Sequence, residues 1–104
     1  MITVITSFQF PKSITREEAR TIFMRAAPKY LGVDGLLRKY YVLSQDGSTG
    51  GGIYLWNSRE EAEAMYTESW KTMARETYGA DPSLSYLESP VVVDNVMHEI
   101  LSDE

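Results

Sequence analysis

The stretch GLLRKYYVLSQDGSTGGGIYLW, residues 35–56, decides the fold of this chain. Its two halves are rich in the aromatic and aliphatic residues that favour strands, and a polar turn with glycine separates them. The pattern predicts a hairpin with strands over about 36–44 and 50–56, joined by a turn at 45–48. The hairpin also sets Arg38 and Lys39 side by side among three tyrosines and a tryptophan. A purely structural hairpin does not need these cations, so we expect a wall for an apolar ligand with a polar or anionic end.

A strand and a helix precede this hairpin. Residues 2–10 alternate in polarity, which predicts a strand with one apolar face made of Ile2, Val4, Phe8 and Phe10. Thr15 and Glu18 have the spacing of a capping box, in which each side chain bonds the other residue's backbone N–H. Apolar residues then recur at helical spacing to about residue 31, and Pro28 is expected to kink the helix or end its regular part.

A second helix and a short strand follow the hairpin. Ser58 and Glu61 repeat the capping-box spacing, and the apolar pattern predicts one helix that ends near Gly79. A fourth strand is predicted over residues 84–87. Residues 91–93 form a further extended piece, and residues 94–104 are expected to be a polar tail.

The predicted order β-α-β-β-α-β is the ferredoxin-like arrangement, an α+β fold with a four-stranded antiparallel sheet and both helices on one face. We expect one domain over residues 1–104, with a core over about 2–93. The strands carry apolar side chains on both faces, because neighbours such as Tyr40 and Tyr41 point in opposite directions. An open apolar sheet face in a chain this small usually meets a second copy. We therefore infer a homodimer.

Composition narrows the classes of partner. The chain has 104 residues, a formal net charge of −5 and no cysteine. Nucleic-acid binders usually present a basic face, so nucleic acid is a poor candidate partner. The longest apolar run is residues 91–93, far shorter than a bilayer span, so we expect no membrane segment. The absence of cysteine removes thiolate metal sites and favours the cytoplasm as the location.

With this topology, GLLRKYY followed by GGIYLW and a capped helix resembles the YdhR-like family of mono-oxygenases. The family belongs to the dimeric α/β-barrel superfamily, in which two ferredoxin-like sheets pack face to face. The resemblance covers most of the chain, from the first strand to about Val93, and is strongest over residues 35–66. Gly35, Lys39 and the run GGIYL at residues 51–55 match the family pattern.

The resemblance implies a small aromatic or enolic substrate, which related enzymes oxidise with dioxygen and without metal or flavin. Such chemistry needs an ionised substrate, a dry pocket and donors for a developing oxyanion. Lys39 and Tyr54 are then the candidate catalytic residues: Lys39 would steady the anion and Tyr54 would orient it. The candidate substrate-binding residues are Tyr41, Trp56, Tyr66 and Trp70. The same aromatic residues also suit ordinary packing, and Lys39 also suits a solvated strand position.

Other candidate residues carry weaker signals. His98 is the only histidine, but it follows the last predicted strand, where a solvated or dimer-contact role is more usual than catalysis. The predicted second helix has no histidine to hold haem, and one histidine without cysteine does not favour a metal site. Glycines 50–52 lead into a strand, so they indicate close backbone approach in preference to a phosphate loop. The acidic residues Glu60, Glu61, Glu63 and Glu68 fit a solvated helix face.

Three functions remain open from the sequence. The first is a homodimeric, cofactor-independent mono-oxygenase. The second is a non-catalytic homodimer of the same fold that binds a small aromatic molecule, favoured by the lack of an acid–base pair. The third is a purely structural assembly role, which would require no ligand pocket.

Overall fold

The computed structural model describes residues 1–103 and has the predicted β-α-β-β-α-β core followed by a second hairpin. The elements are β1 (Ile2–Gln9), α1 (Arg16–Ala26), the 3-10 helix η1 (Ala27–Tyr30), β2 (Leu36–Leu43), β3 (Thr49–Trp56), α2 (Arg59–Met65), α3 (Glu68–Tyr78), β4 (Ser83–Glu88), β5 (Val91–Asp94) and β6 (Glu99–Ser102).

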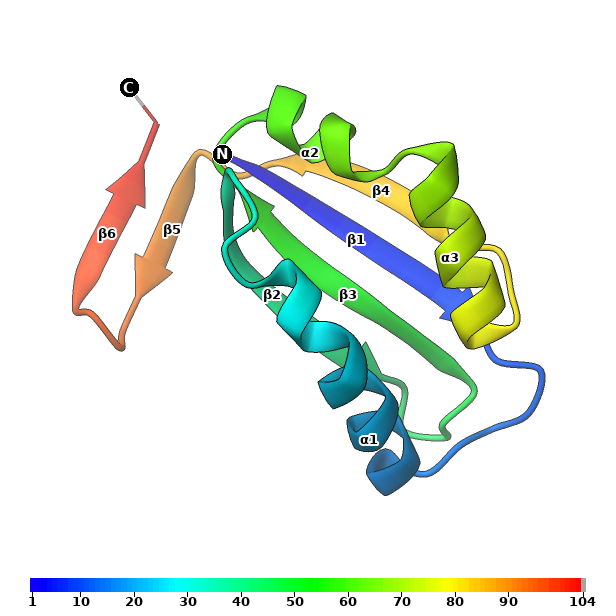
Figure 1. Cartoon of the computed structure of the whole chain (residues 1–104). Helices are drawn as coiled ribbons and strands as arrows, with labels where there is room; N and C mark the ends of the chain where they lie inside the picture. The colour runs from blue at the N-terminus through cyan, green and yellow to red at the C-terminus, as the bar shows by residue number, and fades with distance from the viewer. Residues whose placement is uncertain (104) are drawn as a thin grey trace.

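The main sheet has the strand order β2-β3-β1-β4, and every neighbouring pair is antiparallel. Helices α1, α2 and α3 lie on one side of this sheet, and the β5–β6 hairpin stands apart near the N-terminus (Figure 1). This arrangement confirms the predicted ferredoxin-like fold. Strands β2 and β4 are the two edges of the sheet.

Alternation along the strands separates a covered face from an open face. On β1, Ile2, Val4 and Phe8 are buried beneath the helices, as their spacing predicts. The opposite face of the sheet carries apolar side chains that are open to solvent in the single chain, among them Ile5, Tyr40, Val42 and Leu87. The predicted divergence of Tyr40 and Tyr41 is thus confirmed, since Tyr40 is 54% exposed and Tyr41 packs in the helix layer.

The first helix begins as its capping signal predicts. The Thr15 hydroxyl accepts the N–H of Glu18, and the Glu18 carboxylate accepts the N–H of Thr15. Pro28 lies where α1 gives way to η1, so the expected change at this proline occurs by tightening to a 3-10 turn. This turn directs Tyr30 into the core, where it is 9% exposed.

The prediction of one helix between Ser58 and Gly79 was wrong. Helix α2 stops at Met65, Tyr66 leaves the helical conformation, and α3 starts after Thr67. The Thr67 hydroxyl accepts the N–H of Trp70, so a second N-cap competes with continuation of the first helix. The break turns Tyr66 into the core, where it is 6% exposed.

The prediction of a polar tail over residues 94–104 was also wrong for residues 94–103, while residue 104 lies outside the described residues. Strand β5 pairs with β6 in antiparallel register, from Val91 opposite Ser102 to Asp94 opposite Glu99. His98 lies in the connecting turn with a positive φ of 55°. Sequence alternation is weak in this segment, and a side chain of β5 stabilises the turn.

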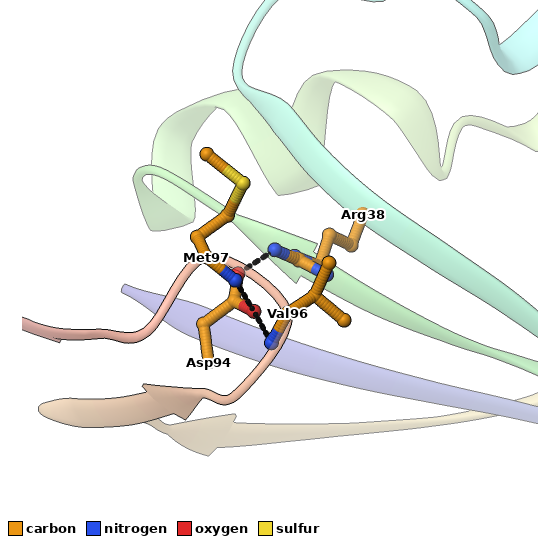
Figure 2. A network of polar contacts seen from close by, with 4 residues as sticks. All are labelled: Arg38, Asp94, Val96 and Met97. Atoms are coloured by element: carbon orange, nitrogen blue, oxygen red, sulfur yellow. Dashed lines mark hydrogen bonds and ion pairs between the residues drawn. The ribbon is translucent and has the colours of Figure 1, made fainter.

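Asp94 organises that turn and fixes the hairpin to the main sheet. One carboxylate oxygen accepts the N–H groups of Val96 (2.9 Å) and Met97 (3.1 Å), and the other binds the guanidinium of Arg38 on β2 (Figure 2). Asp94 is only 6% exposed. An anion so buried is stabilised by its cation and by the backbone donors together.

Among residues 1–103, none of the helices combines the length and the apolar character that a bilayer crossing requires.

Candidate functional site

Lys39 lies at the centre of an aromatic cage on the covered face of the sheet. Its Nζ is 3.3 Å from the ring centroid of Tyr30, 4.0 Å from that of Tyr41 and 4.4 Å from that of Tyr54. The three rings come from η1, β2 and β3, so the fold brings them together from distant parts of the sequence. Ring faces attract cations at these distances.

Strand register and a glycine make room for the lysine stem. On β3, Tyr54 lies opposite Lys39 and Gly52 lies opposite Tyr41. A Cβ at Gly52 would lie 3.3 Å from Cε of Lys39 and 2.9 Å from the Tyr54 ring. Other side chains thus approach the Gly52 backbone closely, as expected for these glycines. The lack of a side chain at Gly52 leaves room for Lys39, Tyr41 and Tyr54 on one short stretch of the sheet.

The pKa of the Lys39 amine lies far below that of an ordinary lysine. Burial, followed by repulsion from Lys29, lowers its pKa to about 6. The tyrosine ring faces favour the ammonium and oppose part of this lowering. Within residues 1–103 no carboxylate pairs with Lys39. At neutral pH the amine therefore has a large neutral fraction and can accept a proton.

The tyrosine hydroxyls of the cage remain donors. Burial raises the pKa of both Tyr41 and Tyr54 well above the ordinary tyrosine value, so both are protonated at neutral pH. The Tyr41 hydroxyl is buried and finds no hydrogen-bond partner in the part of the chain that the structure describes. An unpaired buried hydroxyl is uncommon and marks a place where a ligand group or water would be stabilised.

Two indole N–H groups hold the aromatic layer in place. Trp70 of α3 donates to the Tyr30 hydroxyl at 2.9 Å, and Trp56 of β3 donates to the Tyr66 hydroxyl at 3.0 Å. The first bond joins α3 to the wall of the cage. The second joins the helix break to the sheet, with Trp56 fully buried.

The residues predicted for the site divide into two groups. A cavity of about 10 Å³ is lined by Lys39, Tyr41, Tyr54 and Trp70 together with further residues. Trp56 and Tyr66 do not line it and form the next layer of the core, in contact with Tyr54.

Sequence reasoning missed Tyr30 and Tyr78 as site residues. Both line the same cavity, and Tyr78 stacks on Phe8 with ring centroids 4.1 Å apart. The helical spacing of apolar residues up to about residue 31 predicts only a packing role for Tyr30. Its position directly after Pro28-Lys29 was the available signal, because a proline near a helix end often redirects the next side chains.

Arg38 and Lys39 do not share one wall, which corrects the expectation of paired cations beside the aromatic residues. They are consecutive on β2, so their side chains leave opposite faces of the sheet. Arg38 pairs with Asp94 on the open face, and Lys39 alone enters the cage.

Two surface grooves adjoin the cage along the edge strand β2. One, of about 290 Å³, lies between η1 and β2 and is lined by Tyr30, Lys39 and Tyr41 among others. The other, of about 730 Å³, lies between α1 and β2, and Phe23, Met24 and Tyr41 contribute to it. Tyr41 and Ala27 border both grooves, so Tyr41 stands between the surface and the buried amine.

Other chemistry-bearing residues lie elsewhere. His98 is in the β5–β6 turn and does not line the cage cavity. No group of three or more His, Cys, Asp and Glu residues suited to a metal ion occurs within residues 1–103.

Several solved structures with the same fold are described as oxygenases. SnoaB, a cofactor-independent oxygenase from Streptomyces nogalater, is 14% identical with a TM-score of 0.61, covering 85% of this chain and 91% of its own. A monooxygenase from the gene ActVA-Orf6 of Streptomyces coelicolor, solved with nanaomycin D, is 14% identical with a TM-score of 0.64, covering 85% and 86%. A candidate antibiotic biosynthesis monooxygenase from Deinococcus radiodurans is 12% identical with a TM-score of 0.65, covering 90% and 97%.

These structures share the ferredoxin-like α+β fold with this chain. No protein-family model and no curated protein sequence matches the chain. At such low identity the likeness establishes the fold, and function has to be argued from the site.

Proposed function

We propose that the protein is a cofactor-independent mono-oxygenase for a small aromatic or enolic substrate, of the YdhR-like type. The observation that carries the proposal is the Lys39 amine, which lies inside a cage of tyrosines and pairs with no carboxylate of residues 1–103. The shared fold with a cofactor-independent oxygenase supports the same conclusion.

In the proposed reaction, Lys39 acts first as a base. The neutral amine takes the proton of a phenol or enol hydroxyl, which leaves an electron-rich anion beside the new ammonium. The anion passes one electron to dioxygen, and the resulting radicals join in a carbon–oxygen bond. The peroxide anion so formed takes the proton back from the Lys39 ammonium, and the hydroperoxide then loses water, so that an aromatic C–H and its hydroxyl become a quinone and one molecule of water leaves.

Tyr54 and Tyr41 would serve as hydrogen-bond donors in this scheme. Their hydroxyls keep their protons because burial raises both pKa values. A donor inside a dry cavity stabilises a developing oxyanion more strongly than one in water. The unpaired Tyr41 hydroxyl is free for a substrate oxygen.

The substrate would come from the groove between η1 and β2. The cage cavity of about 10 Å³ holds no more than a water molecule, so an aromatic ring does not fit inside it. The adjoining groove of about 290 Å³ is the larger space, and Lys39 lines it as well.

Oxygen uptake tests this function. Naphthols, anthrones and small enols are screened for thermal stabilisation of the protein, and every hit is followed with an oxygen electrode. We expect uptake with at least one hit, its loss in Lys39→Met, and retention in Lys12→Met, where an exposed lysine is removed. Tyr54→Phe should reduce the rate. Uptake that is unchanged in Lys39→Met and Tyr54→Phe would contradict the assignment.

The second candidate function is a non-catalytic dimer that binds a small aromatic molecule. The absence of histidine and carboxylate from the cavity lining favours it, since no second group is present to pair with Lys39 in acid–base work. This alternative predicts thermal stabilisation by ligands with no oxygen uptake and no product.

A homodimer through the open sheet face belongs to the same proposal. The exposed side chains of Ile5, Tyr40, Val42 and Leu87 form an apolar surface on that face. A surface of this kind is stabilised by burial against a second copy, and the two sheets would then enclose an α/β barrel.

A further inference from the structure

The Lys39 amine has the surroundings of a nucleophile as well as those of a base. Its side chain is only partly open to solvent and is enclosed by tyrosine rings. Lysines react with carbonyl compounds when an apolar or cation-rich site keeps them unprotonated near neutral pH. Both conditions occur here, because the cage is aromatic and the neighbouring charged side chain is Lys29.

The groups around the amine leave it free to react. The titratable side chains that adjoin it are Lys29 and Tyr30 of η1, Tyr41 of β2, Tyr54 of β3 and Tyr78 of α3. None of these is a carboxylate, so within the part of the chain that the structure describes no ion pair holds the nitrogen as ammonium. Burial raises the pKa of Tyr78 to about 12, and those of Tyr41 and Tyr54 are raised as well, so these hydroxyls are neutral donors.

We propose that Lys39 forms an imine with a small aromatic aldehyde or ketone that enters from the groove between η1 and β2. The nitrogen lone pair attacks the carbonyl carbon and gives a carbinolamine. The carbinolamine then loses water, which carries both amine protons, and leaves a C=N bond. The unpaired Tyr41 hydroxyl is the donor for the carbonyl oxygen as it leaves. The tyrosine rings stack on the aromatic body of the carbonyl compound.

Reductive trapping tests the imine on the intact protein. The probe is benzaldehyde with sodium cyanoborohydride at pH 6.5, followed by proteolysis and mass spectrometry of each lysine-containing peptide and of the N-terminus. An ordinary lysine amine is almost fully protonated at this pH, whereas Lys39 is largely neutral. We expect the benzyl adduct on Lys39 to form on the order of 10²-fold faster than on the exposed Lys12.

The pH profile and matched variants decide the outcome. In the unmodified protein, the rate of labelling at Lys39 should be half-maximal near pH 6. This measurement does not depend on the folding of any variant. In Lys39→Met the fast adduct should vanish, and in Lys12→Met it should persist. Labelling of Lys39 no faster than that of Lys12, or labelling that rises only above pH 9, would overturn the proposal.

Imine formation goes beyond the proposed oxygenase function and is tested separately from it. Benzaldehyde has no phenol or enol to oxidise, so trapping reports on the amine alone. Oxygen uptake with naphthols but no trapping of benzaldehyde would support the oxygenase function and overturn the imine proposal. Trapping of benzaldehyde without oxygen uptake would support the imine proposal and contradict the oxygenase function.

Discussion

At the residue scale, the central feature of the molecule is a lysine that the fold holds in a place where its charge is poorly solvated. Three ring faces compensate part of the lost hydration of the Lys39 ammonium. Burial, followed by repulsion from Lys29, lowers the pKa of this amine to about 6. A group of this kind is seldom kept for stability, since an apolar side chain of equal length would fill the same space. Because holding a poorly solvated ammonium lowers the stability of the fold, we infer that Lys39 has a functional role.

The stability of the fold should therefore rise with pH relative to a variant without this amine. Because the pKa of Lys39 is about 6 in the folded chain and lies near 10.4 in an unfolded one, the unfolded state binds more protons between these values. Stability then increases with pH in this window. Relative to Lys39→Met, we expect the free energy of unfolding to gain about 2 kcal/mol between pH 6 and pH 9, after discounting for the rings and for partial exposure.

Urea unfolding of both proteins at several pH values measures this difference. Lys12→Met provides the comparison, because it removes an exposed lysine, and its curve should run parallel to that of the unmodified chain. If Lys39→Met also runs parallel, the amine is ordinarily charged in the fold.

At the element scale, two short connections decide where the aromatic side chains go. The break between α2 and α3 turns Tyr66 onto Trp56, and it places Trp70 in the first turn of α3, from which its indole reaches Tyr30. The cap at Thr67 thus positions two layers of the core.

Thr67→Ala should destabilise the fold by about 1 kcal/mol, since the N–H of Trp70 loses its acceptor at the start of α3. Chemical unfolding followed by tryptophan fluorescence measures the change. Thr77→Ala makes the same substitution at an exposed site within α3 and should be neutral or slightly stabilising. Equal effects of the two substitutions would show that the cap is unimportant.

The β5–β6 hairpin depends on Asp94 in a similar way. Asp94→Ala removes the partner of Arg38 and the acceptor for two turn amides. We expect backbone amides of residues 91–102 to exchange hydrogen at least about tenfold faster, while β1–β4 change little.

Hydrogen exchange with mass spectrometry resolves the two regions. The control is Glu99→Ala, which removes an exposed carboxylate from β6 and should leave exchange unchanged. Uniform acceleration over the whole chain would mean that the hairpin is not an independent unit.

At the scale of the whole molecule, the helices cover one side of the sheet and leave the other open. Apolar side chains on the open face are left exposed to solvent in the single chain. Their presence there supports the proposed pairing with a second copy, which would bury them. Arg38 and the β5–β6 hairpin lie at this same face, with Tyr40, Ile53 and Val92 lining a groove between them. The hairpin would therefore border the interface.

Val42→Lys should convert the proposed dimer to a monomer, because it places a charge on the face where the two sheets meet. Sedimentation at micromolar concentration measures the mass. Met24→Lys serves as the control, since Met24 is 60% exposed on α1 in the helix layer, and it should leave the mass unchanged. A Val42→Lys protein that keeps the mass of the unmodified protein would exclude the open face as the interface.

The order of the core elements was determined by the sequence alone. Period-two alternation, the capping box at Thr15 and the Asp46-Gly47 turn act over a few residues, and each predicted its element. The helix break at Thr67 and strand β6 were not predicted, because each depends on a side chain that outweighs a weak local pattern. Asp94 bonds the β5–β6 turn and an arginine of a distant strand, a contact that local spacing does not reveal.

Only the tertiary structure decided the composition of the site. The sequence singled out Lys39 but paired it with Arg38, whereas the pleat of β2 sends the two cations to opposite faces. Tyr30 and Tyr78 join the cavity from η1 and α3, outside the hairpin that the sequence singled out. The lowered pKa of Lys39 follows from burial among those rings, and burial is a property of the packed molecule that no single stretch of sequence contains.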